Sequence, residues 1–206
     1  MRFLIRRDSL KRAVRWAGSG LIASGILVLG CCLVVHLQRM YFQVREAHTL
    51  SQRFRAKANG SEIEPAPKFD AQRSKQGTVI GQIDIPRLGL STIVVEGTES
   101  RDLTRAAGHV PGTAFPGRPG NTGIAAHRDT LFRPLRWIQN GDAVFLKTSG
   151  AIYSYRVVST AIVAPEDIQV LYPTARESLT LVTCYPFNYI GSAPQRFIVR
   201  AERTSQ

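Results

Sequence analysis

The chain has 206 residues, of which 44% are hydrophobic and 20% are charged, and its formal net charge is +12. This length allows one globular domain with appendages, and this hydrophobic share is that of an ordinary folded protein rather than a disordered one. A basic protein of this kind suits an anionic membrane or nucleic acid. The sequence shows no basic helix with interleaved aromatic residues, so nucleic acid is not an expected partner.

The N-terminal region has the composition of a membrane anchor. Residues 1–16 carry six basic side chains against Asp8 alone, a net charge of +5, and residues 17–37 contain no Asp, Glu, Lys or Arg. About 20 apolar residues in a helix cross the ~30 Å core of a bilayer, and a signal-peptide core has only roughly 7–15. We therefore predict an uncleaved transmembrane helix at 17–37, with a cleaved signal peptide as the alternative. The positive-inside rule places the basic tail 1–16 in the cytoplasm and the rest of the chain outside.

Residues 38–76 are expected to connect this helix to the folded domain. The first part, 38–58, is polar, basic and compatible with a helix that leaves the membrane. The second part, 59–76, is rich in polar residues and Pro and has no periodicity, which indicates a tether. We expect the folded domain to occupy residues 77–203.

From Gly77 onward, short strand patterns alternate with Gly and Pro. Two short helices are expected at 101–107 and 129–138, a Gly/Pro-rich loop at 109–120, and one helical turn in a connector at 165–171. About eight short strands with this punctuation predict a mostly β domain, either a closed barrel or a sandwich. The expected strands are 78–86, 90–95, 121–127, 143–148, 151–158, 159–163, 179–184 and 196–201.

One cysteine stands apart from the membrane segment. Cys31 and Cys32 lie in the apolar run, which leaves Cys184 without a disulfide partner or a CxxC metal pair. Cys184 ends a predicted strand, and a loop at 185–195 leads to the returning strand. A lone cysteine at the mouth of a hairpin outside the cytoplasm is either a buried packing residue or a reactive thiol.

A cysteine nucleophile reacts as the thiolate, which a nearby imidazolium or other cation stabilises. The chain has four histidines, and His36 and His48 lie in or near the membrane segment. His109 lies inside the Gly/Pro-rich loop, whereas His127 ends an apolar strand. Active sites on β scaffolds gather at strand ends and loops, so we favour His127 over His109. The alternative for either residue is a hydrogen-bonded structural histidine.

An arginine at the start of the returning strand is the expected oxyanion donor. Arg196 lies near the same end of the hairpin as Cys184, whereas Arg200 lies four residues deeper, roughly 13 Å along a strand. A guanidinium is always charged and offers planar donors for a developing oxyanion. Arg128 is an alternative, although its neighbour His127 should point the other way in an extended segment.

These residues together resemble the active site of the sortases, the cysteine transpeptidases of the bacterial cell surface. The run Thr-Leu-Val-Thr-Cys at 180–184 is similar to the active-site motif of that family, and His127 and Arg196 fall where the family has its other catalytic residues. The His-Arg-Asp-Thr run at 127–130 and the short connector at 165–178 resemble class D members most. Similarity covers about residues 77–201.

The resemblance implies an eight-stranded closed β-barrel with its site at one end of neighbouring strands. It implies that Cys184 attacks the carbonyl after a threonine to form a thioester, that His127 protonates the leaving amine, and that Arg196 binds the oxyanion. Thr183 is expected to orient the substrate or Arg196. No cofactor or metal is expected for this chemistry.

The resemblance also implies the partners and the location. The expected substrates are secreted proteins with a C-terminal sorting signal, and the expected acceptor is an amine on a cell-wall peptide or a pilin lysine. The expected place is the bacterial cell membrane, with residues 17–37 in the bilayer and the domain outside. Two alternatives stay open: an extracellular cysteine hydrolase that uses water as acceptor, and a surface binding barrel without turnover.

Overall fold

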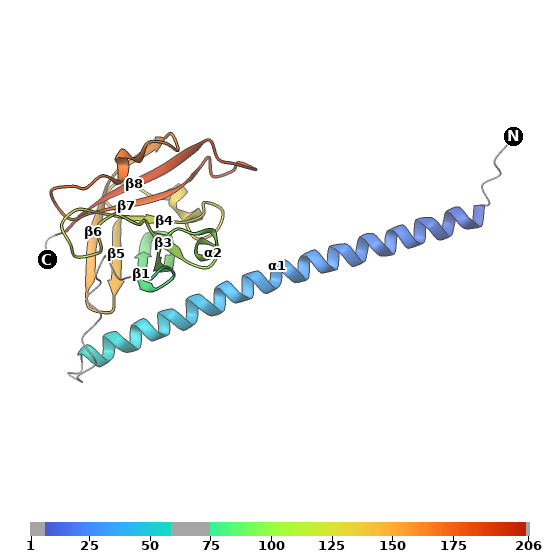
Figure 1. The fold of residues 1–206 in the computed structure, drawn as a ribbon, viewed down its shortest axis with the longest axis horizontal. Coiled ribbons are helices and arrows are strands. Elements are labelled where there is room, and N and C mark those ends of the chain that lie inside the picture. Colours follow the sequence, from blue (N-terminus) through green and yellow to red (C-terminus); the bar gives the residue numbers. More distant parts are fainter. Residues whose placement is uncertain (1–6, 59–74, 205–206) are drawn as a thin grey trace. The chain divides into compact units, whose positions relative to one another are not determined.

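A long helix and a closed barrel make up the described part of the protein, which is residues 7–58 and 75–204 of a computed structural model (Figure 1). Helix α1 spans Arg7–Ala58, and the short helices are η1 Pro86–Leu88, α2 Ser100–Leu103, η2 Arg133–Trp137 and η3 Ile168–Leu171. The strands are β1 Val79–Ile85, β2 Leu90–Glu96, β3 Ala107–His109, β4 Asn121–Ala125, β5 Ala143–Thr148, β6 Ile152–Val163, β7 Ser178–Tyr185 and β8 Gln195–Arg203.

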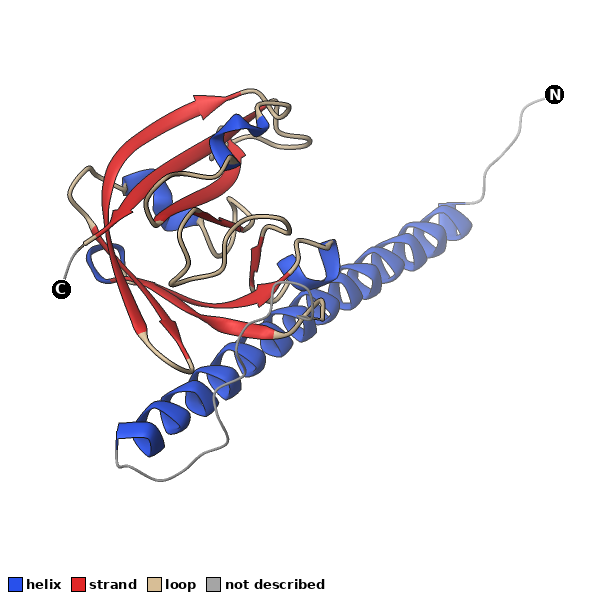
Figure 2. Ribbon diagram, turned by 60° about the vertical axis from the view of Figure 1, so that its left-hand side comes forward, coloured by secondary structure: helices blue, strands red, loops and turns tan. Residues whose placement is uncertain are grey.

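The eight strands close into one barrel in the order β1-β2-β3-β4-β7-β8-β6-β5, and Figure 2 shows them curving around a common interior. The pairs β2–β3 and β4–β7 are parallel, and the other pairs are antiparallel. Closure removes the free edges that an open sheet would present. The prediction of a mostly β, eight-stranded closed barrel is confirmed, and the sandwich is excluded.

Two strands expected at 151–158 and 159–163 are one strand, β6. Its pairing with β8 shifts register between Val157 and Ser159. A bulge of this kind adds a residue to one strand and bends it without ending it. The break that the sequence pattern indicated is therefore a bend in a continuous strand.

The helix expected at 101–107 is mostly wrong, because helix α2 ends at Leu103 and β3 begins at Ala107. β3 has only three residues, which are too few to show a periodic pattern in the sequence. It forms because both neighbouring strands pair with it: Ala107 pairs with Val94 of β2, and Gly108 pairs with Ala125 of β4. A Cβ on Gly108 would lie 2.2 Å from the carbonyl oxygen of Gly97, so only glycine fits at this position.

The helix expected at 129–138 is likewise shorter than predicted. The chain makes turns after His127, and only Arg133–Trp137 forms a helix, of the 3-10 type. Pro134 lies in its first turn, where a missing backbone N–H costs nothing.

The barrel core follows from strand alternation. Inward positions of β1, β5, β7 and β8 hold Ile83, Leu146, Leu181 and Val199, each with 0% of its surface exposed. Burying one such side chain contributes about 1.5–3 kcal/mol relative to exposure. Phe132, just after the His127 turn, is also fully buried in this cluster. The segment that follows β4 is therefore fixed to the core.

Helix α1 contains the predicted membrane segment. Among the described residues, Lys11–Gln52 is one helix long and apolar enough to cross a bilayer by length and composition, and it includes residues 17–37. The helix continues to Ala58, in agreement with a helical 38–58. Residues 1–6 of the expected tail and 59–74 of the expected tether lie outside the described residues.

The chain divides into two compact units between Tyr41 and Phe42. Within the second unit, the C-terminal part of α1 packs on the barrel, with Leu50 buried against Ile93, Val95 and Ala106. The segment that we expected to lead away from the membrane therefore contributes to the core of the second unit.

Candidate active site

The hairpin of β7 and β8 places a thiol beside a guanidinium. In the antiparallel register of these strands, Cys184 lies directly opposite Arg196. Side chains of directly opposed residues project from the same face of a sheet and are close neighbours. Two residues that are 12 positions apart in the chain are thus brought together by the turn.

His127 lies in the segment that follows β4, the parallel partner of β7. In the β4–β7 register Ala125 lies beside Val182, and the backbone N–H of Ala126 donates to the Val182 carbonyl at 3.2 Å. β4 ends at Ala125, two residues earlier than the expected strand 121–127, so His127 lies two residues beyond the last pair, as Cys184 lies two residues beyond Val182. The structure therefore pairs Cys184 with Arg196 and places His127 in the segment just after the neighbouring strand.

Strand alternation decides which face carries these groups. Leu181 and Val199 point into the core, so Cys184 and Arg196, at odd offsets from them, project from the outer face of the barrel. Cys184, His127 and Arg196 are all half-buried. A half-buried thiol on an outer face is accessible to a substrate, unlike a cysteine packed in the interior.

Backbone carbonyls hold the guanidinium of Arg196. Its Nη1 donates to the carbonyls of Ala193 at 3.2 Å and Gln195 at 3.0 Å. Arg200 is engaged elsewhere, because its Nη2 donates to the carbonyl of Val170 at 3.1 Å. Arg196 is thus the β8 arginine beside the thiol, and Arg200 fixes the connector before β7.

Asn121 also holds the connector in place. The sequence alone did not single out this residue. Its side-chain oxygen accepts from Thr180 at 2.8 Å, and its Nδ2 donates to the Val170 carbonyl at 3.0 Å. The residue is buried and joins β4, β7 and the connector that carries η3. No local signal marks it, because its partners lie 49 and 59 residues away.

His109, the other candidate histidine, is a buried structural residue with only 1% of its surface exposed. Its Nδ1 lies 2.8 Å from Glu96 Oε2, and its Nε2 lies 3.1 Å from the Ala114 carbonyl oxygen. The ring also stacks on Phe115 with centroids 4.6 Å apart. Both ring nitrogens are engaged and shielded, which favours His127 as the group available for proton transfer.

Arg128, the alternative oxyanion donor, is directed to the loop between β7 and β8. Its Nη2 donates to the carbonyls of Tyr189 at 2.7 Å and Gly191 at 3.0 Å. Arg196 also donates to two backbone carbonyls, so these bonds do not separate the two arginines. Arg196 is favoured for the oxyanion because it lies directly opposite Cys184 in the β7–β8 register.

Thr183 points to the inner face of the barrel. It is 3% exposed, and its hydroxyl donates to the carbonyl of Ala126 at 2.7 Å. This bond joins β7 to the residue that follows β4, next to His127, and a role of Thr183 in orienting substrate or Arg196 stays a prediction. The inward direction of Thr183 follows from alternation, because a residue adjacent to the outward Cys184 must point inward.

A thiol opposite a guanidinium on the outer face of a closed barrel, with a histidine just after the neighbouring strand, suits a cysteine-dependent acyl-transfer enzyme. Comparison with known proteins gives the family. The sortase domain model matches residues 83–204, and the chain belongs to the sortase family, whose members are cysteine transpeptidases.

Relatives of known name agree with this assignment. The chain is 34% identical to Sortase D of Bacillus subtilis over 134 residues, which cover 65% of this chain and 68% of that protein. It is 31% identical to Sortase A of Streptococcus agalactiae over 60% of this chain and 52% of that protein.

Solved structures share the barrel. A Sortase D5 transpeptidase of Clostridium perfringens superposes with a TM-score of 0.59 at 31% identity, over 65% of this chain and 84% of that one. A Clostridium perfringens sortase C, solved with the C-terminal cell wall sorting motif, gives a TM-score of 0.60 at 26% identity, over 78% and 88%. The resemblance to class D sortases read from the sequence is in keeping with these similarities.

Proposed function

We propose that this protein is a membrane-anchored transpeptidase that cleaves a C-terminal sorting signal of secreted proteins after a threonine and transfers the product to an amine. The observation that carries the proposal is the register of β7 and β8. It sets Cys184 directly opposite Arg196 on the outer face, and His127 follows β4, the other neighbour of β7, by two residues.

In the first half-reaction, the thiolate of Cys184 attacks the carbonyl carbon after the threonine. The oxyanion that forms accepts hydrogen bonds from the Arg196 guanidinium, which is most valuable where charge develops in the transition state. His127 gives its proton to the leaving amine as the carbon–nitrogen bond breaks. The products are a thioester on Cys184 and the released C-terminal peptide.

In the second half-reaction, an amine attacks the thioester carbonyl. Neutral His127 takes the proton that the amine loses, a new amide bond forms, and the thiolate of Cys184 leaves. The acceptor is an amine of a cell-wall peptide or a pilin lysine. Water in place of the amine would give hydrolysis, and no reaction at all would leave a binding barrel.

The membrane helix gives this chemistry its location. Residues 17–37 of α1 anchor the chain in the bacterial cell membrane, and the basic tail before them favours a cytoplasmic N-terminus. The barrel then lies outside the cytoplasm, where secreted substrates pass. The sorting motif in the sortase C structure is a property of that protein, and it supports the same class of substrate here.

A peptide-library cleavage assay with competing amines, read by mass spectrometry, tests the proposal. We expect cleavage after threonine and a product carrying one of the amines, and Cys184→Ala should abolish both. Full activity in Cys184→Ala would overturn the mechanism. A product carrying only water would assign the protein to the hydrolases, and no cleavage of any peptide would support a binding role.

A labelling experiment separates a reactive thiol from an inert one. The comparison is made in a background in which Cys31 and Cys32 are replaced by serine, so that Cys184 is the remaining thiol. A thiol-directed reagent should then label the protein stoichiometrically, and Cys184→Ala in the same background should give no label. Absence of labelling in the parent protein would contradict an accessible nucleophile.

A further inference from the structure

An arginine next to the proposed general acid holds the loop that separates β7 from β8. Arg128 donates from Nη2 to two carbonyls of this loop, those of Tyr189 and Gly191, and its guanidinium carbon lies 5.7 Å from the centre of the Tyr189 ring. Hydrogen bonds that involve a charged group are the stronger class. Arg128 therefore ties the turn after β4 to the loop at residues 186–194.

The loop has little packing of its own at this point. Ile190, between the two carbonyls that Arg128 binds, is 98% exposed, and Tyr189 is 47% exposed. Exposed segments with few buried apolar contacts open at low free energy. The path of the loop around Ile190 is thus fixed mainly by the bonds from Arg128.

The far end of the same loop holds Arg196. Of the two carbonyls that receive the Arg196 guanidinium, that of Ala193 belongs to the loop, two residues after Gly191, and that of Gln195 belongs to the first residue of β8. A displacement of the loop at Gly191 therefore moves the Ala193 acceptor, one of the two that position Arg196. The chain of contacts runs from the Arg128 guanidinium through the loop backbone to the Arg196 guanidinium.

The first part of the loop has a separate restraint. Arg136 of η2 lies over the Phe187 ring, with its guanidinium carbon 5.7 Å from the ring centre. Phe187 also packs against the core and against Phe197. Loss of Arg128 would therefore release the half of the loop next to Arg196 and leave the half next to Cys184 in place.

We propose that Arg128 is a positioning residue that sets the location of Arg196 through the loop between β7 and β8. The inference rests on the oxyanion role proposed for Arg196. Because that role concerns charge that appears in the transition state, loss of Arg128 acts on kcat rather than on KM.

Steady-state kinetics of transfer, with a peptide selected in the library assay, test this role in the full-length protein. Arg128→Ala should lower kcat about tenfold or more, since removing an oxyanion donor outright costs roughly 10²–10³, and KM should stay within about twofold. Arg128→Lys keeps the charge but not the planar fork, so it should be intermediate. Arg133→Ala removes an exposed arginine nearby and should match the wild type.

Limited proteolysis with chymotrypsin tests the restraint without any need for activity. Cleavage after Tyr189 should be faster in Arg128→Ala than in the wild type or Arg133→Ala, at an unchanged melting temperature. If the wild type cleaves no peptide, the proposed function fails while this measurement still reports on the loop.

Three results would overturn the inference. One is a wild-type kcat in both Arg128 variants, another is a loss confined to KM, and the third is unchanged cleavage after Tyr189. If Arg128→Ala does not fold, Arg128→Lys carries the test, and equality of its kcat and its proteolysis rate with those of the wild type overturns the inference.

Discussion

Thr183 donates its hydroxyl to the backbone carbonyl of Ala126 at 2.7 Å, and this bond joins the strand of the thiol to the segment that carries His127. Both residues are buried, with 3% and 5% of their surfaces exposed. Because Thr183 precedes Cys184 and Ala126 precedes His127, the bond fixes the distance between the two strand ends just below the site. It is a structural link between the proposed nucleophile and the proposed general acid.

Replacing Thr183 with valine tests this link. Valine has nearly the same shape but leaves the buried Ala126 carbonyl without its donor, which costs about 1–3 kcal/mol. We expect a lower melting temperature and a lower kcat, measured by thermal unfolding and by peptide cleavage. Thr183→Ser keeps the hydroxyl and should retain most of the activity. A valine variant as stable and as active as the wild type would show that the Thr183 hydroxyl contributes neither to stability nor to activity.

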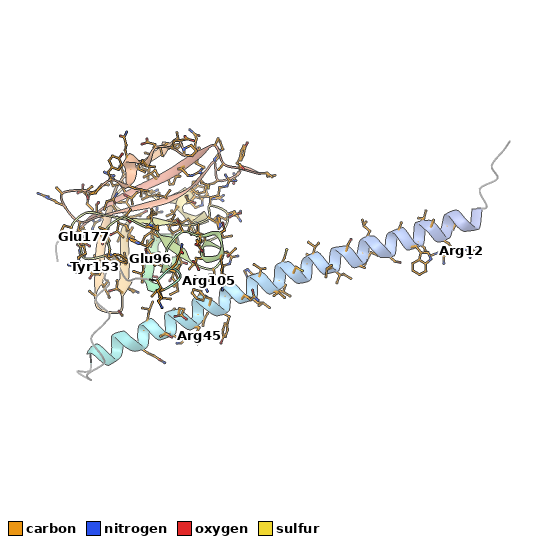
Figure 3. The ribbon with its side chains drawn as sticks, in the orientation of Figure 1. Arg12, Arg45, Glu96, Arg105, Tyr153 and Glu177 are labelled. Carbon is orange, nitrogen blue, oxygen red and sulfur yellow. The ribbon has the colours of Figure 1, made fainter. Side chains whose placement is uncertain are left out.

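The two histidines should respond to substitution in opposite ways. His109→Ala removes a buried ring and leaves Glu96, labelled in Figure 3, without its partner. It should therefore destabilise the barrel by about 1–3 kcal/mol or more. His127→Ala removes a half-buried ring and should abolish transfer while the protein stays folded. Thermal unfolding and cleavage assays of both variants check this.

The reverse pattern would reassign the general acid. An active His127→Ala together with a folded but inactive His109→Ala would show that His109 reaches the substrate. His109→Gln serves as an intermediate, since an amide replaces part of the hydrogen bonding of the ring. It should recover some of the stability that His109→Ala loses.

Elements with a strong local pattern were predictable from the sequence. In β1 apolar and polar residues alternate over the second half of the strand, and β5 begins with an apolar run directly after the turn at 140–142; both signals belong to one segment. The hairpin of β7 and β8 was also predictable, because its two strands are neighbours in the chain. The sequence alone therefore predicts that Cys184 and Arg196 lie near the same end of the hairpin.

Contacts between distant segments were not predictable. The bond from Thr183 to Ala126 spans 57 residues, and the bond from Arg128 to Tyr189 spans 61. Nothing in the local sequence of either residue specifies its partner, which depends on the strand order of the closed barrel. β3 was missed for the same reason, because its three residues are held by β2 and β4 rather than by a pattern of their own.

Gln43 of α1 should contribute to the stability of the second unit. Its Oε1 accepts from the Ile93 N–H at 2.8 Å, and its Nε2 donates to the Arg105 carbonyl at 2.7 Å. β3 begins opposite Val94, so the Ile93 N–H lies just beyond the pairing that β3 provides. The amide of Gln43 thus continues the hydrogen bonding of β2 where β3 is too short.

We expect Gln43→Ala in the full-length protein in detergent to lower stability by about 1–3 kcal/mol, since it leaves buried backbone groups unpaired. That corresponds to roughly 2–4 °C in melting temperature per kcal/mol for a domain of this size. Alanine favours helix more than glutamine does, so helix propensity cannot explain a loss. Gln52→Ala, an exposed position of the same helix, is the control and should be neutral. Equal melting temperatures for both variants would contradict the docking role.

Asp142 gives the barrel a stability term that depends on pH. The hydrogen bond from Arg87 lowers the pKa of this carboxyl, with Nη2 donating to Oδ2 at 2.7 Å, and the backbone N–H of Gln139 adds to the effect. A lowered folded-state pKa means that the stabilisation is present above the unfolded-state value, about 3.9, and is lost as the pH falls through the folded-state value.

Asp142→Asn should therefore be less stable than the wild type at about pH 7 and 5, with a difference that shrinks below about pH 4. Urea unfolding across this range measures the difference, with the exposed Asp167→Asn as the control for the change of charge. A deficit that does not change with pH would show that the amide fails for steric reasons and that the charge of Asp142 is not what stabilises the barrel.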